Sequence, residues 1–110
     1  MDRLEFLVQG SAVDPYQVTF TKERDNMNAY CTCPAGENGI YCKHRFGILD
    51  GSTKNIVSDN IDQVPVIVEW LKGTDVEFTL NRVRELEGKA LELKKMLSSA
   101  KKRLAEAMRR

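Results

Sequence analysis

Residues 31–44 read CTCPAGENGIYCKH, and this stretch holds all three cysteines and the only histidine of the 110-residue chain. The four side chains are spaced as CxC, eight residues, and then CxH. Zinc prefers four sulfur or nitrogen ligands in a tetrahedron, and Cys31, Cys33, Cys42 and His44 complete that shell. A catalytic zinc keeps one position open for water, so the spacing predicts one structural zinc ion.

Two other interpretations of these residues are open. The cysteines are either reduced thiols clustered by chance, or Cys31 and Cys33 are a redox pair with Cys42 and His44 incidental. A redox dithiol does not need the distant CxH, and three cysteines cannot all pair within one chain. Their bunching therefore favours a metal in a reducing compartment, and we expect an intracellular, cytoplasmic protein.

The residues before this stretch show the period-two pattern of half-buried strands. Leu4, Phe6 and Val8 alternate with Glu5, Leu7 and Gln9, and apolar and polar side chains alternate again over residues 16–20. We expect a longer hairpin loop over residues 22–28 and a third strand that reaches Cys33 and ends at Pro34. Such an antiparallel sheet is too small to be stable on its own apolar face, so the zinc is expected to join it to the following helix.

Helical patterns follow the motif. Residues 43–49 suit a short helix, and residues 61–72 suit a second one that ends at Gly73. An apolar stripe is expected on this second helix at Ile61, Val64, Val68 and Leu71. Thr74 and Glu77 then have the spacing of a capping box at the start of a proline-free helix to Arg110.

These patterns predict an α+β fold. It consists of a small antiparallel β-sheet and a short helix around a structural zinc, followed by a helix and a long C-terminal helix with coiled-coil character. The expected organisation is a zinc-binding module over 1–50, a loop and packing helix over 51–73, and a long basic helix over 74–110.

Three short motifs carry a resemblance to a known family. They are Tyr16-Gln-Val18, Cys31-Thr-Cys33-Pro34 and Cys42-Lys43-His44. Over roughly residues 4–50 the chain resembles the SWIM-type zinc finger family, whose signature is CxC followed by CxH. The resemblance implies a short sheet and a helix around zinc, and a finger that binds DNA or protein. Residues 51–110 lie outside it, so the activities of larger relatives are not implied.

The C-terminal segment has the pattern of a coiled coil. Apolar residues follow 3-4 spacing without a break, at Val83, Leu86, Ala90, Leu93, Leu97, Ala100, Leu104 and Ala107. The flanking e and g positions hold five basic residues against one acidic residue, namely Glu87, Lys89, Lys94, Met96, Lys101, Arg103, Met108 and Arg110. Like charges would meet in a symmetric pair, so we expect the helix to dock on an acidic surface through Leu86, Leu93, Leu97 and Leu104. That surface belongs to a protein partner or to the chain's own N-terminal part, and self-association is the remaining option.

The charge of the chain is divided unevenly. Residues 1–78 hold 7 Lys and Arg against 12 Asp and Glu, whereas residues 79–110 hold 10 against 4. The basic residues near the end suggest nucleic-acid contact, because clustered cations displace counterions from phosphates. Cations in the last turns of a helix also simply complement its macrodipole. The candidates for nucleic-acid contact are Lys101, Lys102, Arg103, Arg109 and Arg110.

Several function classes are disfavoured. No apolar run approaches the roughly 18 residues of a membrane span, and no second histidine or nucleophile–base pair suggests an enzyme or a small-molecule substrate. We therefore expect a zinc-binding interaction module that acts as an adaptor for a protein partner, in the setting of a DNA-processing complex. The alternative is a DNA-binding accessory protein that uses the basic C-terminal helix.

Overall fold

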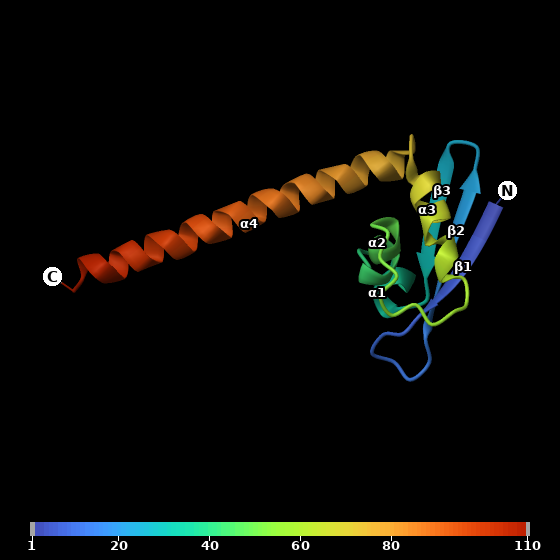
Figure 1. The fold of residues 1–110 in the computed structure, drawn as a ribbon, viewed down its shortest axis with the longest axis horizontal. Helices are drawn as coiled ribbons and strands as arrows, with labels where there is room; N and C mark the ends of the chain where they lie inside the picture. The colour runs from blue at the N-terminus through green and yellow to red at the C-terminus, as the bar shows by residue number, and fades with distance from the viewer. Residues whose placement is uncertain (1, 110) are drawn as a thin grey trace. The chain divides into compact units, whose positions relative to one another are not determined.

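The computed structural model describes residues 2–109 of the chain (Figure 1). These residues form two compact units, one that extends to Glu77 and one that begins at Phe78. The first unit contains the β-sheet and the short helices, and the second is helical throughout its described length apart from its last turn. The α+β class predicted from the sequence is confirmed.

The sheet has three antiparallel strands in the order β1 (Asp2–Val8), β2 (Tyr16–Glu23) and β3 (Asn26–Cys31). The expected loop over residues 22–28 is wrong, because β2 and β3 continue to a tight turn at Arg24 and Asp25. Lys22 stays in the ladder opposite Met27, whose side chain is buried. The ammonium group of Lys22 donates to the Trp70 carbonyl at 2.9 Å, and this bond holds the end of the sheet to the helix that contains Trp70.

One face of the sheet supplies the core of the first unit. Phe6, Val18 and Phe20 are fully buried there, and the two phenylalanine rings meet edge to face at 6.1 Å. The alternating pattern of the sequence places these residues on a single face. The opposite face is mostly polar, with Arg3, Glu5, Gln17, Thr19 and Thr21 beside the exposed Leu7 on β1 and β2.

The outer edge of β1 is covered by a returning segment of chain. Val57 donates its N–H to the Leu7 carbonyl at 2.8 Å, and Gln9 donates to the Asn55 carbonyl at 2.8 Å. Ile56 is buried between these two bonds and bridges to Val8. This pairing satisfies an otherwise open strand edge and fixes residues 52–55 near the end of β1.

Two short helices follow the sheet. Helix α1 (Pro34–Glu37) lies between the CxC and CxH pairs, where the sequence indicated no helix, and α2 (Lys43–Leu49) has the predicted bounds. The third strand ends at Cys31 and not at Cys33. The reason is that Cys33 is the N-cap of α1, where its sulfur accepts the N–H of Gly36 at 3.2 Å.

The second predicted helix is divided into a 3-10 turn, η1 (Ile61–Gln63), and helix α3 (Val64–Leu71). The expected stripe is therefore wrong at its first position. Ile61 is 41% exposed, whereas Ile67 is fully buried together with Val64 and Leu71. The tighter 3-10 turn places Ile61 out of phase with the α-helical face that follows.

Helix α4 (Asp75–Ala107) is one continuous element that passes through Gly88. The hydroxyl of Thr74 accepts the N–H of Glu77 at 3.2 Å, as the capping box predicts. The Glu77 carboxylate accepts from the N–H of Gly73 and not from that of Thr74. Among residues 2–109, no helix combines the length and apolar character that crossing a membrane requires.

Candidate metal centre

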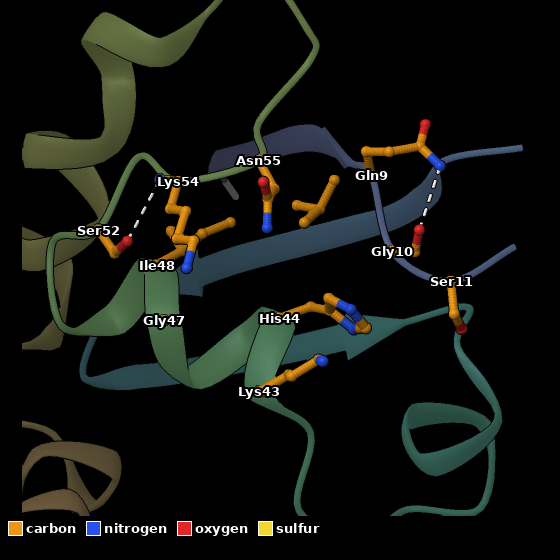
Figure 2. A pocket seen from close by; sticks show the side chains of 11 residues that line it. Gln9, Gly10, Ser11, Lys43, His44, Gly47, Ile48, Ser52, Lys54 and Asn55 are labelled. Atoms are coloured by element: carbon orange, nitrogen blue, oxygen red, sulfur yellow. Dashed lines mark hydrogen bonds between the residues drawn. The ribbon is translucent and has the colours of Figure 1, made fainter.

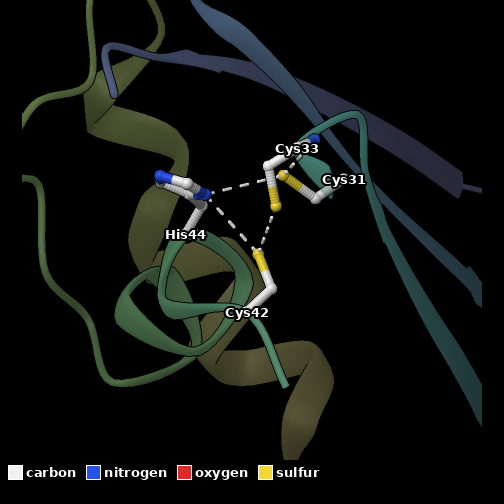
Figure 3. A group of neighbouring side chains, drawn as sticks. All are labelled: Cys31, Cys33, Cys42 and His44. Carbon is white, nitrogen blue, oxygen red and sulfur yellow. Dashed lines mark hydrogen bonds between the residues drawn. The ribbon is translucent and has the colours of Figure 1, made fainter. Parts of the chain in front are cut away.

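The four predicted ligands come from the end of the sheet and the starts of two helices (Figure 3). Cys31 is the last residue of β3, and Cys33 and Cys42 are the N-caps of α1 and α2. His44 lies in the first turn of α2. All three cysteines are buried and none forms a disulfide. The motif therefore joins the sheet to both helices at one point.

Three of the six separations between the donor atoms of these residues are close to the edges of a zinc tetrahedron. The Cys33 and Cys42 sulfurs are 3.4 Å apart, and Nδ1 of His44 lies 3.8 Å from the Cys31 sulfur and 3.6 Å from that of Cys42. All four ligand atoms lie within 4.8 Å of one another. Zinc bonds of about 2.3 Å to sulfur and about 2.05 Å to nitrogen require edges of about 3.8 Å and about 3.6 Å. The donor set therefore fits one zinc ion.

Backbone N–H groups point at the sulfurs. The N–H of Cys33 donates to the Cys31 sulfur at 3.5 Å, and that of Gly36 donates to the Cys33 sulfur at 3.2 Å. Such bonds stabilise thiolates and hold their orientation. Gly36 is required by this packing, since a Cβ atom there would lie 2.5 Å from the Cys31 carbonyl oxygen.

The metal-free thiols differ in acidity. Burial raises the pKa of the Cys31 thiol to about 12; the N–H of Cys33 opposes this shift, and the side-chain hydrogen bonds with Cys33 and Cys42 add to it. Burial also opposes ionisation of Cys42, but bonds from the Arg45 N–H and from Cys33 and His44 lower the pKa of that thiol to about 6. Zinc is bound by thiolates, so its entry must displace the proton that Cys31 carries at neutral pH.

The imidazole of His44 is held by packing on its outer side. Its ring lies 5.0 Å from the ring of Tyr16, and its Nε2 is buried with no hydrogen-bond partner among residues 2–109. A Cβ atom at Gly10 would lie 3.2 Å from Nε2 and 2.5 Å from the Tyr16 ring. Gly10 and Tyr16 therefore fix the ring with Nδ1 toward the sulfurs. Tyr16 is part of the Tyr16-Gln-Val18 motif of the sequence analysis. No pattern in the sequence indicated Gly10, because the residues that Gly10 contacts are remote along the chain.

The other predicted site residues belong to the second unit. The four leucines Leu86, Leu93, Leu97 and Leu104 lie on α4 and are 47%, 64%, 56% and 60% exposed. Lys101, Lys102 and Arg103 are exposed on the same helix, and Arg109 is in the turn after it. Arg110 lies outside the described residues.

The comparison with protein families agrees with this geometry. Residues 16–49 match the family model of the SWIM zinc finger. No curated protein and no solved structure matches the chain. The matched segment runs from the start of β2 to the end of α2 and includes the four clustered ligands. Residues 16–49 of this chain are thus a SWIM zinc finger whose three cysteines and one histidine are suited to one zinc ion.

Proposed function

We propose that this chain is an adaptor, in which the zinc finger is a folded platform and α4 docks on a helical protein partner. The exposed leucines of α4 carry the proposal. Leu93, Leu97 and Leu104 are each more than half exposed and recur at the spacing of a coiled-coil seam. A contiguous exposed apolar surface of this kind is uncommon on a monomer and marks a contact surface.

The charges beside the seam indicate the chemistry of the partner. Glu85 pairs with Arg82 at 3.2 Å and with Lys89 at 3.1 Å, so the first part of α4 is partly neutralised. Further along, Lys94, Lys101 and Arg103 form no ion pair with a carboxylate among residues 2–109. A second copy would bring these cations together. A partner helix with glutamates at its e and g positions would neutralise them.

The zinc ion has a structural role in this proposal. Four protein ligands complete the shell, which leaves no position where a water or a substrate could be activated. The chain is therefore a binding module and not a catalyst. Its buried thiols must stay reduced to hold the metal, so we place its function in a reducing, intracellular compartment.

A pair of designed peptides tests the docking proposal. Both peptides carry leucine at the a and d positions, and one has glutamate and the other has lysine at the e and g positions. We expect the zinc-loaded chain to bind only the glutamate peptide in isothermal titration calorimetry. Leu93→Asp and Leu97→Asp should abolish this binding, with zinc content unchanged.

Leu91→Asp is the matched control. Leu91 is exposed to a similar extent on the same helix but lies off the seam, so this variant should still bind the glutamate peptide. Equal binding of both peptides, or binding by Leu93→Asp at the wild-type affinity, would show that the seam is not the docking surface.

The alternative function is direct DNA binding by the end of α4. Its support is the exposure of Lys101, Lys102 and Arg103 in one turn of the helix. It predicts DNA binding that weakens steeply with salt and that is abolished when these three residues are replaced by alanine. Absence of salt-sensitive binding to single-stranded and duplex DNA would refute it.

A further inference from the structure

A pocket of about 540 Å³ lies beside the zinc finger, between the end of β1, the start of α2 and residues 52–55 (Figure 2). Its polar lining includes the side chains of Lys43, Lys54 and Asn55. None of these three side chains forms a hydrogen bond or an ion pair within residues 2–109. We call this the lysine pocket. It offers two ammonium groups and an amide as free donors.

The charge of this pocket differs from that of its surroundings. Residues 1–78 hold 12 acidic against 7 basic residues, yet no carboxylate of the described residues lines the lysine pocket. Two unpaired lysines in an acidic unit form a local positive site. Its donors suit an oxyanion such as a phosphate group.

A second pocket of about 490 Å³ adjoins the first, because Ser11, Lys43 and His44 line both. Its remaining lining consists of the rings of Tyr16 and Tyr41, of Pro34 and Ala35, and of Cys33 and Cys42, so this pocket opens onto the candidate zinc site. We call this the tyrosine pocket. Tyr41 is 59% exposed although one face of its ring stacks on Phe46 at 4.4 Å. That stacking supports the ring, which remains largely exposed at the pocket and can take up a planar group.

We propose that the two pockets together bind a nucleotide, with a phosphate group in the lysine pocket and the base in the tyrosine pocket. Both volumes are in the range of small-ligand sites, roughly 300–1,000 Å³. Lys43 lies at the boundary of the pockets, where the phosphate and the sugar of one nucleotide join. This surface is formed by the zinc finger together with residues that flank it in the first unit, and it does not depend on the seam of α4.

A phosphate beside an aromatic group also occurs in phosphotyrosine peptides. Proteins that read phosphopeptides use clustered arginines, whose planar guanidinium groups bind the phosphate with two parallel hydrogen bonds. The lysine pocket has lysines and an amide but no arginine in its lining. Lysines bind phosphate as point charges, and exposed tyrosine rings are common platforms for unpaired bases. The lining therefore favours a nucleotide.

Binding of a short fluorescein-labelled single-stranded DNA to the zinc-loaded chain, followed by fluorescence anisotropy, tests this proposal. Competitors are AMP, an abasic strand and a duplex of the same length. We expect the abasic strand and the duplex to compete poorly, because neither presents a free base. Competition by AMP as strong as by the strand identifies the free nucleotide as the ligand. Much stronger competition by the strand identifies single-stranded nucleic acid.

Substitutions distinguish binding at the two pockets from binding by α4 and from non-specific attraction to positive charge. Tyr41→Ala should weaken binding by roughly tenfold, as expected for removal of one stacked base, and Tyr41→Phe should retain it. Lys43→Gln with Lys54→Gln should reduce the salt slope by about 0.7 for each phosphate that the protein no longer neutralises. The matched controls are Tyr30→Ala, with the same 59% exposure on another face, and Lys72→Gln, and they should bind as wild type.

The same titrations are repeated with Lys101, Lys102 and Arg103 replaced by alanine, so that binding by α4 is removed. Zinc content and the far-ultraviolet circular dichroism of each variant show that it is folded. Unchanged affinity in Tyr41→Ala and in the double lysine variant, both folded, would overturn the proposal. A phosphotyrosine peptide that binds more tightly than any nucleotide would overturn it as well.

Discussion

Removal of zinc is expected to unfold the finger and the sheet that it joins. A zinc ion bound to this cluster would join Cys31 at the end of β3, Cys33 at the start of α1, and Cys42 and His44 at the start of α2. Without it, the junction retains three buried thiols, an imidazole whose Nε2 has no partner among residues 2–109, and the hydrogen bond that Arg45 of α2 donates to the Ala29 carbonyl of β3 at 3.3 Å. The perturbation is a strong zinc chelator added to the intact chain.

The expected magnitude follows from the size of the first unit. Domains have free energies of unfolding of roughly 0.05–0.15 kcal/mol per residue, which is about 4–12 kcal/mol for this unit. Structural zinc in small fingers contributes an apparent 10–16 kcal/mol or so. The contribution of the metal is thus comparable to the total stability or larger, and the apo form should not remain folded over residues 16–49.

Hydrogen exchange measured by mass spectrometry, with and without chelator, locates the effect. Amides of β2, β3 and α2 should lose protection together, and the fluorescence of Trp70 should report loosening of the adjoining packing. Re-addition of zinc should restore both signals. Unchanged protection of residues 16–49 in protein shown to be free of zinc would refute the structural role of the metal.

Three further predictions concern single groups. Zinc affinity should fall more steeply with acidification below about pH 6 than above it, because zinc must then displace the proton of Cys42 as well as that of Cys31. Competition with a chromophoric chelator at several pH values measures this affinity. An affinity independent of pH between 5 and 8 would contradict the prediction. Gly36→Ala should destabilise the zinc form by about 1–3 kcal/mol in thermal unfolding, whereas Gly47→Ala, in a helix with open space around it, should not destabilise it. Gly88→Ala should stabilise α4 by roughly 1 kcal/mol, because alanine is a better helix former than glycine. Circular dichroism should show higher helicity on heating, and helicity equal to that of the wild type would contradict this prediction.

Much of the local structure followed from the sequence because its causes are local. Alternation of apolar residues indicated β1 and β2, and the stretch before Asp50 predicted α2 with its observed bounds. The CxC and CxH pairs indicated the ligand set, since few other residue types bind zinc. The predictions that were wrong concern the residues at which strands, helices and turns begin and end. The β2–β3 turn is shorter than expected because Lys22 is held by a carbonyl of α3, which is remote in sequence.

The sequence by itself determined the candidate zinc ligands and which face of each strand is apolar, because ligand chemistry and side-chain period are properties of the residues. Only the tertiary structure placed Gly10 against His44, covered the edge of β1 with residues 55–57, and brought Lys43 and Lys54 to one pocket beside Tyr41. Those arrangements depend on which segments the zinc and the core bring together. Contacts between residues far apart in the chain leave no period or spacing in the sequence, so they appear only when the chain is folded.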